Sequence, residues 1–225
     1  MLLATSLYKA GRYEDAYQAF GQALRLDAEH RKSIGESGLP YLPSQQKSDL
    51  SNKGMLQALM KSFDEARKTA EELKSLIEKG INTNELQGYE YILGLIELGK
   101  KNPRRAADLF SRACGRLNFE SYGTVDVFEH AWTFDALARA LYESGELDKA
   151  RKEYEKITLL TFGRLEDGDI YAKAYYRLGK IAEQQGDKVR ASQNFRKFLD
   201  LWKDADAGLP EVADARKRVA GLKGR

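Results

Sequence analysis

The sequence has few of the residue types from which metal centres and catalytic sites are built. Its 225 residues include one cysteine and two histidines. The single cysteine, Cys114, excludes an intrachain disulfide and a thiolate metal cluster. His30 and His130 lie far apart in the chain and do not have the spacing of a zinc site. Because the phosphate-binding patterns GxxxxGK and GxGxxG are also missing, we expect no metal, no cofactor and no enzymatic activity.

Long apolar runs and proline are scarce as well. No run is long enough to cross a bilayer, and residues 1–5 lack the cationic lead and apolar core of a secretion signal. We therefore expect a cytoplasmic chain without a membrane partner. Only four prolines occur, while Ala, Leu, Glu, Lys, Arg and Gln dominate. These residues lose little entropy in a helix, so the composition predicts an all-α fold.

Charge of one sign is not in large excess. Thirty-seven basic and 34 acidic residues leave a net charge of +3. The segment 209–225 alone carries a cationic surplus as large as that of the whole chain, so the remainder is balanced. Nucleic-acid binding normally requires a broader basic face. We expect no nucleic-acid partner.

What the sequence does contain is a repeat, found by aligning the chain with itself. Each copy has a small residue near the start of its second helix: Ala16, Ala66, Ala106, Ala150 and Ala191. A large aromatic residue follows four positions later in four copies: Phe20, Phe110, Tyr154 and Phe195. The small residue lets two helices approach closely, and the aromatic ring one turn along fills the groove between them.

The junctions between the paired helices carry the expected stop signals. Gly11, Gly145 and Gly186 suit the left-handed conformation that ends a helix. In the copy around Ala106, Asn102-Pro103 ends one helix and starts the next. The copy around Ala66 is degenerate, because Ala70 stands at its aromatic position. Helices are therefore expected over 1–10, 13–29, 50–61, 64–79, 85–99, 103–117, 127–144, 147–161, 169–185, 188–203 and 210–222.

These residues, with the pairs Leu93-Gly94 and Leu178-Gly179 in the first helices, resemble the tetratricopeptide repeat (TPR). The copies are spaced more widely than the standard unit of about 34 residues, which indicates a long-repeat variety. The resemblance implies a right-handed superhelical solenoid of about five helical hairpins with a C-terminal capping helix. The second half also resembles the C-terminal TPR array of large bacterial multidomain signalling proteins.

The resemblance divides the chain into seven segments. They are a first TPR (1–30), an irregular connector (31–49), a degenerate TPR (50–80), three further TPRs (85–118, 127–162 and 169–204) and the capping helix (209–225). The connector is predicted from its glycines, serines, Pro40 and Pro43. Met1 falls within the first helix of the pattern, so that helix is either frayed or, as we favour, truncated by loss of upstream residues.

By the family pattern, one face of each first helix lines a concave groove that holds a peptide or protein partner. The residues predicted for this groove are Tyr91, Leu95, Leu98, Trp132, Asp135, Arg139, Tyr142, Lys173, Tyr176 and Lys180. Trp, Tyr and Arg are the residue types that dominate binding energy at interfaces. The alternative is that Tyr91, Trp132 and Tyr176 pack between repeats, as large aromatic residues on helices usually do.

The sequence thus predicts a protein–protein interaction scaffold or adaptor, and a monomer. Its partner is expected to present apolar anchors and some acidic residues to the groove. Thr5 and Tyr8 occupy the inner-face positions of the first repeat, so the Lys/Asn clamp with which one TPR subclass grips chaperone tails is absent. The alternative function is a regulatory or sensor module of a larger bacterial signalling protein, linked to a kinase or to transcription, which binds a ligand or controls an attached domain.

Overall fold

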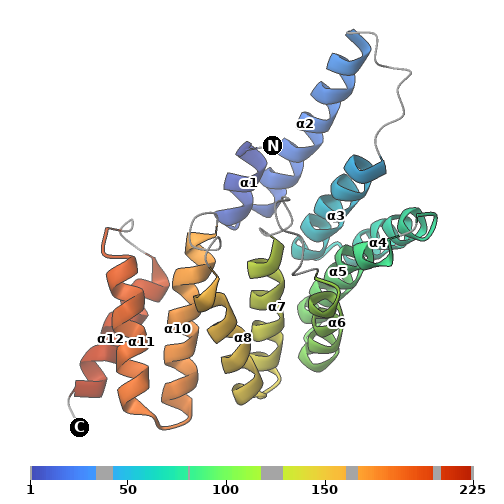
Figure 1. Cartoon of the computed structure of the whole chain (residues 1–225). Helices are drawn as coiled ribbons and strands as arrows, with labels where there is room; N and C mark the ends of the chain where they lie inside the picture. Colours follow the sequence, from blue (N-terminus) through green and yellow to red (C-terminus); the bar gives the residue numbers. More distant parts are fainter. Residues whose placement is uncertain are drawn as a thin grey trace. The chain divides into compact units, whose positions relative to one another are not determined.

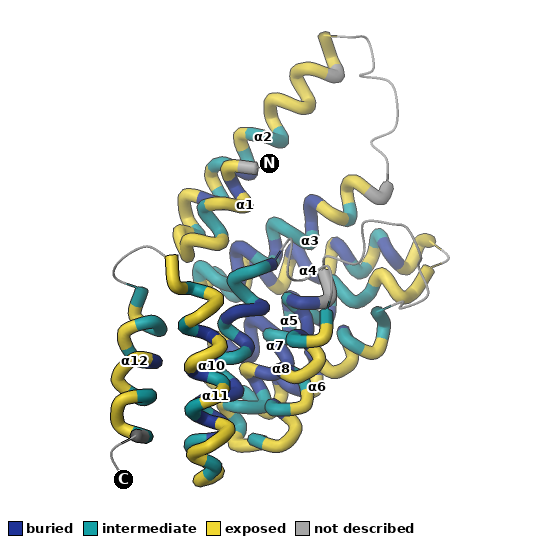
Figure 2. Tube along the Cα trace, turned by 60° about the vertical axis from the view of Figure 1, so that its left-hand side comes forward, coloured by how far each residue is buried: buried dark blue, intermediate teal, exposed yellow. Residues whose placement is uncertain are grey.

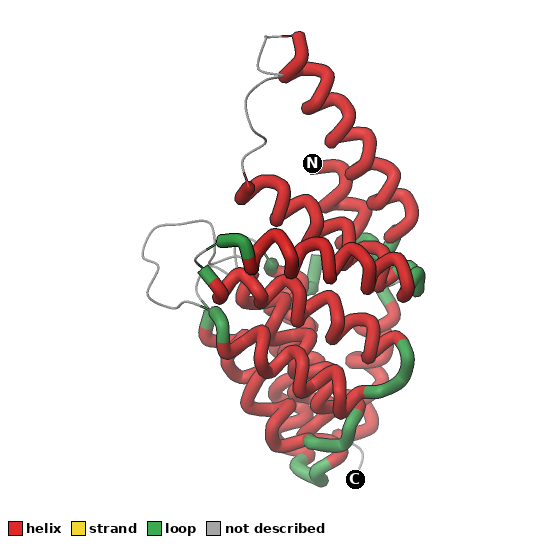
Figure 3. The backbone as a smooth tube through the Cα atoms, turned by 90° about the vertical axis from the view of Figure 1, so that its right-hand side faces the viewer, coloured by secondary structure: helices red, strands yellow, loops and turns green. Residues whose placement is uncertain are grey.

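The computed structural model describes residues 2–33, 43–80, 82–117, 129–160, 167–204 and 209–223. Within these ranges the regular structure is entirely helical, without a strand (Figure 3). Figure 1 labels the α-helices, which are α1 (Leu2–Lys9), α2 (Tyr13–Ser33), α3 (Pro43–Leu59), α4 (Phe63–Glu78), α5 (Leu86–Gly99), α6 (Pro103–Gly115), α7 (Glu129–Glu143), α8 (Leu147–Leu159), α10 (Gly168–Gln184), α11 (Lys188–Leu201) and α12 (Pro210–Lys223). A short 3-10 helix, η2 (Thr83–Glu85), precedes α5. None of the described helices has the length and apolar character that crossing a membrane requires.

The chain divides into two compact units, Met1–Leu117 and Asn118–Arg225. In the first unit the helices pack as consecutive pairs, α1 with α2, α3 with α4 and α5 with α6. In the second unit α7 pairs with α8 and α10 with α11, and α12 then packs on α11. Each unit is therefore built from neighbouring helical hairpins, and its buried residues gather where helices meet (Figure 2).

All five hairpins close with the same turn. One residue in each turn has a positive φ: Gly11, Lys61, Lys101, Gly145 and Gly186. The amide of the residue after it donates to the carbonyl five positions back, as Glu146 does to Leu141 at 2.9 Å. This pattern satisfies carbonyl groups that the end of a helix would otherwise leave without partners.

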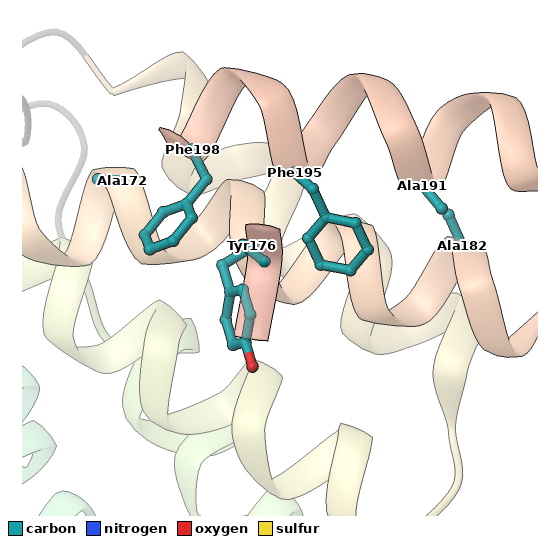
Figure 4. Close-up of a cluster of buried hydrophobic side chains, with 7 residues drawn as sticks. Ala172, Tyr176, Ala182, Ala191, Phe195 and Phe198 are labelled. Carbon is teal, nitrogen blue, oxygen red and sulfur yellow. The ribbon is translucent and has the colours of Figure 1, made fainter. Parts of the chain in front are cut away.

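Small residues let the paired helices approach closely, and in α5–α6 and α10–α11 a glycine lies directly against an aromatic ring. The alanines predicted to allow close approach, Ala16, Ala66, Ala106, Ala150 and Ala191, are all 0% exposed. At Gly94 a β-carbon would come within 2.5 Å of the Phe110 ring, and at Gly179 within 2.7 Å of the Phe195 ring. The first helix can therefore lie against the ring only because these positions lack a side chain. Figure 4 shows Phe195 and Phe198 of α11 beside Tyr176 of α10.

The degenerate hairpin, α3–α4, fills its core differently. Ala70 replaces the aromatic residue, and Ile92 of α5 occupies the space instead. A β-carbon at Gly54 would lie 2.6 Å from Cδ1 of Ile92. A buried hydrogen bond from Thr69 Oγ1 to Gln57 Oε1, at 2.7 Å, joins the two helices. The neighbouring hairpin thus supplies the volume that this one lacks.

The irregular connector predicted at 31–49 was too long. Helix α2 continues to Ser33, and α3 begins at Pro43 rather than at residue 50. Proline favours the first turn of a helix because its φ is preset and its missing N–H has no partner there. Pro43 was interpreted as a breaker, whereas it starts a helix. Residues 34–42 of the predicted connector, and residues 127–128 at the predicted start of the fourth repeat, lie outside the described residues.

Candidate functional site

Three of the ten residues predicted for the groove belong to α5 in the first unit. Tyr91 is half-buried, and its ring centroid lies 5.5 Å from that of Phe110. Leu95 and Leu98 are 7% and 8% exposed. These three side chains pack against other residues of the unit. The face of α5 that was predicted to line the groove is therefore an apolar packing face.

Two glutamates of α5 are buried although their counterparts in other repeats are apolar, such as Phe134. Glu90 accepts hydrogen bonds from Arg116 at 2.8 Å and Arg112 at 3.3 Å, which fasten α5 to the end of α6. Glu97 accepts a hydrogen bond from the Asn102 amide at 3.1 Å. The sequence interpretation missed this role, because a single Glu on a helix is indistinguishable from a solvated one until its neighbours are known.

The other seven predicted residues lie on α7 and α10, which contact each other in the second unit. The Trp132 indole nitrogen donates to Asp167, the residue before α10, at 2.8 Å. Tyr176 is 6% exposed; its ring packs against Phe195 and Phe198 (Figure 4). Its hydroxyl donates to Asp214 of α12 at 2.6 Å. Both aromatic residues therefore join elements within the unit, Trp132 at the start of α10 and Tyr176 between α10 and α12.

Lys180 is the centre of this face. Its ammonium nitrogen lies 5.8 Å from the ring centroids of Tyr142 on α7 and Tyr176 on α10. Burial lowers the pKa of Lys180, and the charges of Arg177 and Arg218 lower it further. The Tyr142 hydroxyl accepts a hydrogen bond from the Gln184 amide at 2.6 Å. The site thus holds a lysine between two aromatic faces, a contact that attracts a cation to π electrons.

Further positive charges surround it. Arg139 of α7 is exposed. Lys173 lies 3.9 Å from Asp169 and 5.7 Å from the Trp202 ring centroid. Arg177, which the sequence interpretation missed, lies 5.8 Å from the Tyr176 ring centroid. Its place one turn after Lys173 is the spacing that could have revealed it.

Asp135 is the acidic member of the predicted set. It is half-buried, and removal from water raises the pKa of its carboxyl group. The charges of Arg139, Arg177 and Lys173 act in the opposite direction. The Asp135 carboxylate offsets part of the positive charge of Arg139, Arg177 and Lys173 but does not cancel it.

Helix α12 borders the site on the far side of Tyr176. Arg218 donates to Asp214 at 2.6 Å and also to Glu183 of α10. The Arg218 hydrogen bond is the main reason why the pKa of Asp214 is lowered. Burial, with the hydrogen bond to Asp214, raises the pKa of Tyr176 to about 12. Glu183 is thereby engaged by Arg218. Among the described residues Lys180 forms no ion pair, although the charges of Asp214 and Glu183 act on it.

Tyr154 of α8 was predicted only as a core residue, but it also carries a polar group at this site. Its side chain is 0% exposed, and its hydroxyl has no hydrogen-bond partner among the described residues. Burial raises the pKa of Tyr154, and the charge of Asp135 adds to that effect. The Tyr154 hydroxyl oxygen therefore lies in the core near Asp135 without a hydrogen bond to any described residue.

The arrangement offers aromatic faces, cations and hydrogen-bonding groups on two consecutive first helices. Such a surface can bind a segment of polypeptide. Among the described residues, no three His, Cys, Asp or Glu side chains come together as a metal site would require.

The family model described as tetratricopeptide repeat matches residues 1–33 and 136–210. None of the curated proteins matches the sequence. Many solved structures are similar in fold, and three of them illustrate the likeness.

BtubC (BKLC) from P. vanneervenii is 18% identical with a TM-score of 0.64, over 93% of this chain and 81% of that one. PlcR from Bacillus thuringiensis, solved with the peptide PapR7 and DNA, is 14% identical with a TM-score of 0.65, over 99% of this chain and 72% of that one. YrrB, a TPR protein with an unusual peptide-binding site, is 18% identical with a TM-score of 0.53, over 95% of this chain and 88% of that one.

The family match reaches into both compact units, and the paired helices, shared turn and small-to-aromatic core contacts are those that the repeat pattern requires. The chain contains tetratricopeptide repeats, and its described hairpins have the fold of a TPR solenoid.

Proposed function

We propose that this chain is a protein-interaction scaffold and that a segment of its partner binds along α7 and α10 of the second unit. The residues that make direct contact in this proposal are Trp132, Asp135, Arg139, Tyr142, Lys173 and Lys180, joined by Arg177. Tyr176 supports the face from beneath. The partner segment presents apolar anchors and acidic residues to it.

The position of Lys180 carries the proposal. Among the described residues neither Lys180 nor Arg177 forms an ion pair, yet each lies 5.8 Å from the centroid of the same Tyr176 ring. Burial is the main reason why the pKa of Lys180 is lowered, and the charges of Arg177 and Arg218 lower it further against the opposing charges of Asp214 and Glu183. A carboxylate from a partner would relieve this repulsion, and charge complementarity would speed the encounter and select the partner.

Aromatic surface supports the same proposal. Trp132 and Tyr142 are half-buried, so part of each ring stays open to a ligand. Large rings of this kind supply most of the binding energy where they are covered on association. Two of the structural neighbours are PlcR, solved with the peptide PapR7, and YrrB, which has a peptide-binding site. Both are in keeping with a peptide segment as ligand.

Co-purification from a lysate tests the proposal, with variants chosen so that the unit stays folded. Trp132 and Tyr176 are unsuitable targets, because each makes a hydrogen bond that joins helices. The test variant is Arg139→Ala/Lys180→Ala. Its matched control is Arg196→Ala/Lys197→Ala, which removes two exposed cations from α11.

We expect a partner retained by the wild type and the control and lost from the test variant, with unchanged helicity. The retained partner should dissociate as salt rises, because exposed charges are screened. A partner held equally by all three proteins would place the interaction on another face, and the proposed site would then be wrong.

A further inference from the structure

One repeat differs from its neighbours at two positions that face each other in the hairpin. Three residues before the close-packed small residue of the first helix, the hairpins α5–α6, α7–α8 and α10–α11 carry Tyr91, Asp135 and Tyr176. At the aromatic position of the second helix they carry Phe110, Tyr154 and Phe195. The hairpin α7–α8 therefore has an aspartate–tyrosine pair where the hairpins on either side have a tyrosine–phenylalanine pair.

The two flanking hairpins use this pair for packing. The Tyr91 and Phe110 rings lie 5.5 Å apart, and the Tyr176 and Phe195 rings 5.9 Å apart. Such tilted aromatic contacts stabilise a core beyond the area they bury. Tyr154 makes no ring contact among the described residues. The hairpin α7–α8 thus forgoes a packing contact that its neighbours have.

In place of that contact this hairpin has two polar groups that make no hydrogen bond to any described residue. Asp135 forms no hydrogen bond or ion pair within the described part of the chain. Within the described ranges the buried Tyr154 hydroxyl has no hydrogen-bond partner either, and an unsatisfied buried hydroxyl is destabilising. Phenylalanine fills the equivalent place in three other hairpins, so packing alone does not require the hydroxyl. Groups that cost stability and serve no packing purpose are typical of binding sites.

The charges around the pair limit what it can bind. Arg139, Arg177 and Lys173 all act on Asp135, so an incoming cation meets three like charges. A carboxylate, in turn, meets the charge of Asp135 itself. A neutral group that both donates and accepts hydrogen bonds suits the two side chains, because it can donate to the Asp135 carboxylate and accept from the Tyr154 hydroxyl.

We propose that Asp135 and Tyr154 form a subsite for the side-chain carboxamide of an asparagine or glutamine in the partner segment. This rests on the proposed function, because the carboxamide lies on the same segment whose acidic residues bind Lys180 and Arg177. The half-buried carboxylate of Asp135 receives the amide N–H. The Tyr154 hydroxyl is closed to water in the unbound chain, so binding includes a side-chain movement that opens it, as is common at interfaces.

Selection from a phage-displayed library of random twelve-residue peptides tests the subsite without knowledge of the natural partner. The baits are the full-length wild type, Asp135→Ala, and the control Asp200→Ala, which removes an exposed aspartate from α11. Peptides selected by the wild type and the control should share acidic positions and one Asn or Gln position at fixed spacing. Those selected by Asp135→Ala should keep the acidic positions and lose the carboxamide.

A synthetic selected peptide then gives the magnitude. Replacing its Asn or Gln by Leu should weaken binding to the wild type about tenfold, the loss of one or two buried hydrogen bonds. The same replacement should change binding to Asp135→Ala by less than about twofold. Tyr154→Phe should bind the peptide more weakly than the wild type and yet unfold at a higher urea concentration, because the unsatisfied hydroxyl is gone.

Other outcomes overturn the inference. An acidic consensus without a carboxamide position, or Lys or Arg at that position, would leave the scaffold proposal standing and refute the subsite. A lower urea midpoint for Tyr154→Phe would show that the hydroxyl is already satisfied in the unbound chain. A wild type that selects no peptide at all would refute the proposed function and the subsite with it.

Discussion

At the scale of single residues, the clearest regularity is the left-handed position of each hairpin turn. Three turns use glycine there, but Lys61 and Lys101 have φ values of 65° and 64°. A residue with a β-carbon is strained in this region by about 1 kcal/mol or more, whereas glycine is not. The sequence predicted the glycine turns. It did not predict Lys61 and Lys101, because lysine gives no sign of a left-handed conformation until the repeat is aligned.

Lys61→Gly and Lys101→Gly should each stabilise the protein by about 0.5–1 kcal/mol, since the relief of strain exceeds the added flexibility of the unfolded chain. Urea unfolding followed by circular dichroism measures this. Lys79→Gly serves as the control, because Lys79 ends α4 with an ordinary φ of −77° and should lose stability. Equal losses at all three positions would mean that the turns are not strained.

Residue positions on a helix could be assigned from the sequence, but not what covers them. The spacing of Leu95 and Lys180 relative to Gly94 and Gly179 is the same, so both were predicted to face a groove. In the structure Leu95 is buried and Lys180 is half-buried. Spacing fixes the direction of a side chain from its own helix, while exposure depends on neighbouring helices that the pattern does not describe.

At the scale of elements, pairing was predictable and boundaries were less so. A small residue followed four positions later by an aromatic one marks a close contact between two helices, and this contact recurs in the hairpins. Helix ends depend on single residues whose effect is ambiguous. Pro43 is an example, because proline both ends a preceding helix and favours the first turn of the next. Long-range ion pairs such as Arg218 with Glu183 leave no mark in a local pattern.

Helix α12 illustrates how such pairs hold an element in place. Only Ala215 is fully buried, while Val212, Val219 and Leu222 are partly buried against the α10–α11 core. Asp214 adds hydrogen bonds from Tyr176 and Arg218, both at 2.6 Å. We therefore expect this carboxylate to contribute measurably to the attachment of α12.

Asp214→Asn should destabilise the protein by about 1 kcal/mol at neutral pH, the usual contribution of one hydrogen bond. The pKa of Asp214 is lowered on folding, so its stabilisation is present above the unfolded pKa and is lost as the pH falls through the folded one. The difference between Asp214→Asn and the wild type should therefore vanish in acid. Chemical unfolding between pH 7 and pH 3 measures it, with Asp200→Asn as the exposed control. A difference that persists unchanged at pH 3 would rule out the charged hydrogen bond as its cause.

At the scale of the whole molecule, each unit is a series of hairpins whose contacts are mostly with the next hairpin along the chain. Stability in such proteins is the sum of local terms and nearest-neighbour terms, and segments open separately. A packing defect in one hairpin should consequently lower the local stability of that hairpin most. The equivalent glycines Gly94 and Gly179, one in each unit, make a matched pair of sites for introducing the same defect.

Gly94→Ala places a methyl group within 2.5 Å of the Phe110 ring, and Gly179→Ala within 2.7 Å of the Phe195 ring. Overpacking of this kind costs about 1–3 kcal/mol. Native-state hydrogen exchange should show faster exchange in α5 and α6 for the first variant and in α10 and α11 for the second. The control is Gly21→Ala in α2, where no atom lies within 4 Å, and where the better helix propensity of alanine should stabilise by about 1 kcal/mol.

If both defects raised exchange equally in all hairpins, the chain would unfold as one cooperative body, and a ligand bound at α7 and α10 would then stabilise α1 as much as α10. If exchange follows the defect, binding at the second unit should protect that unit first.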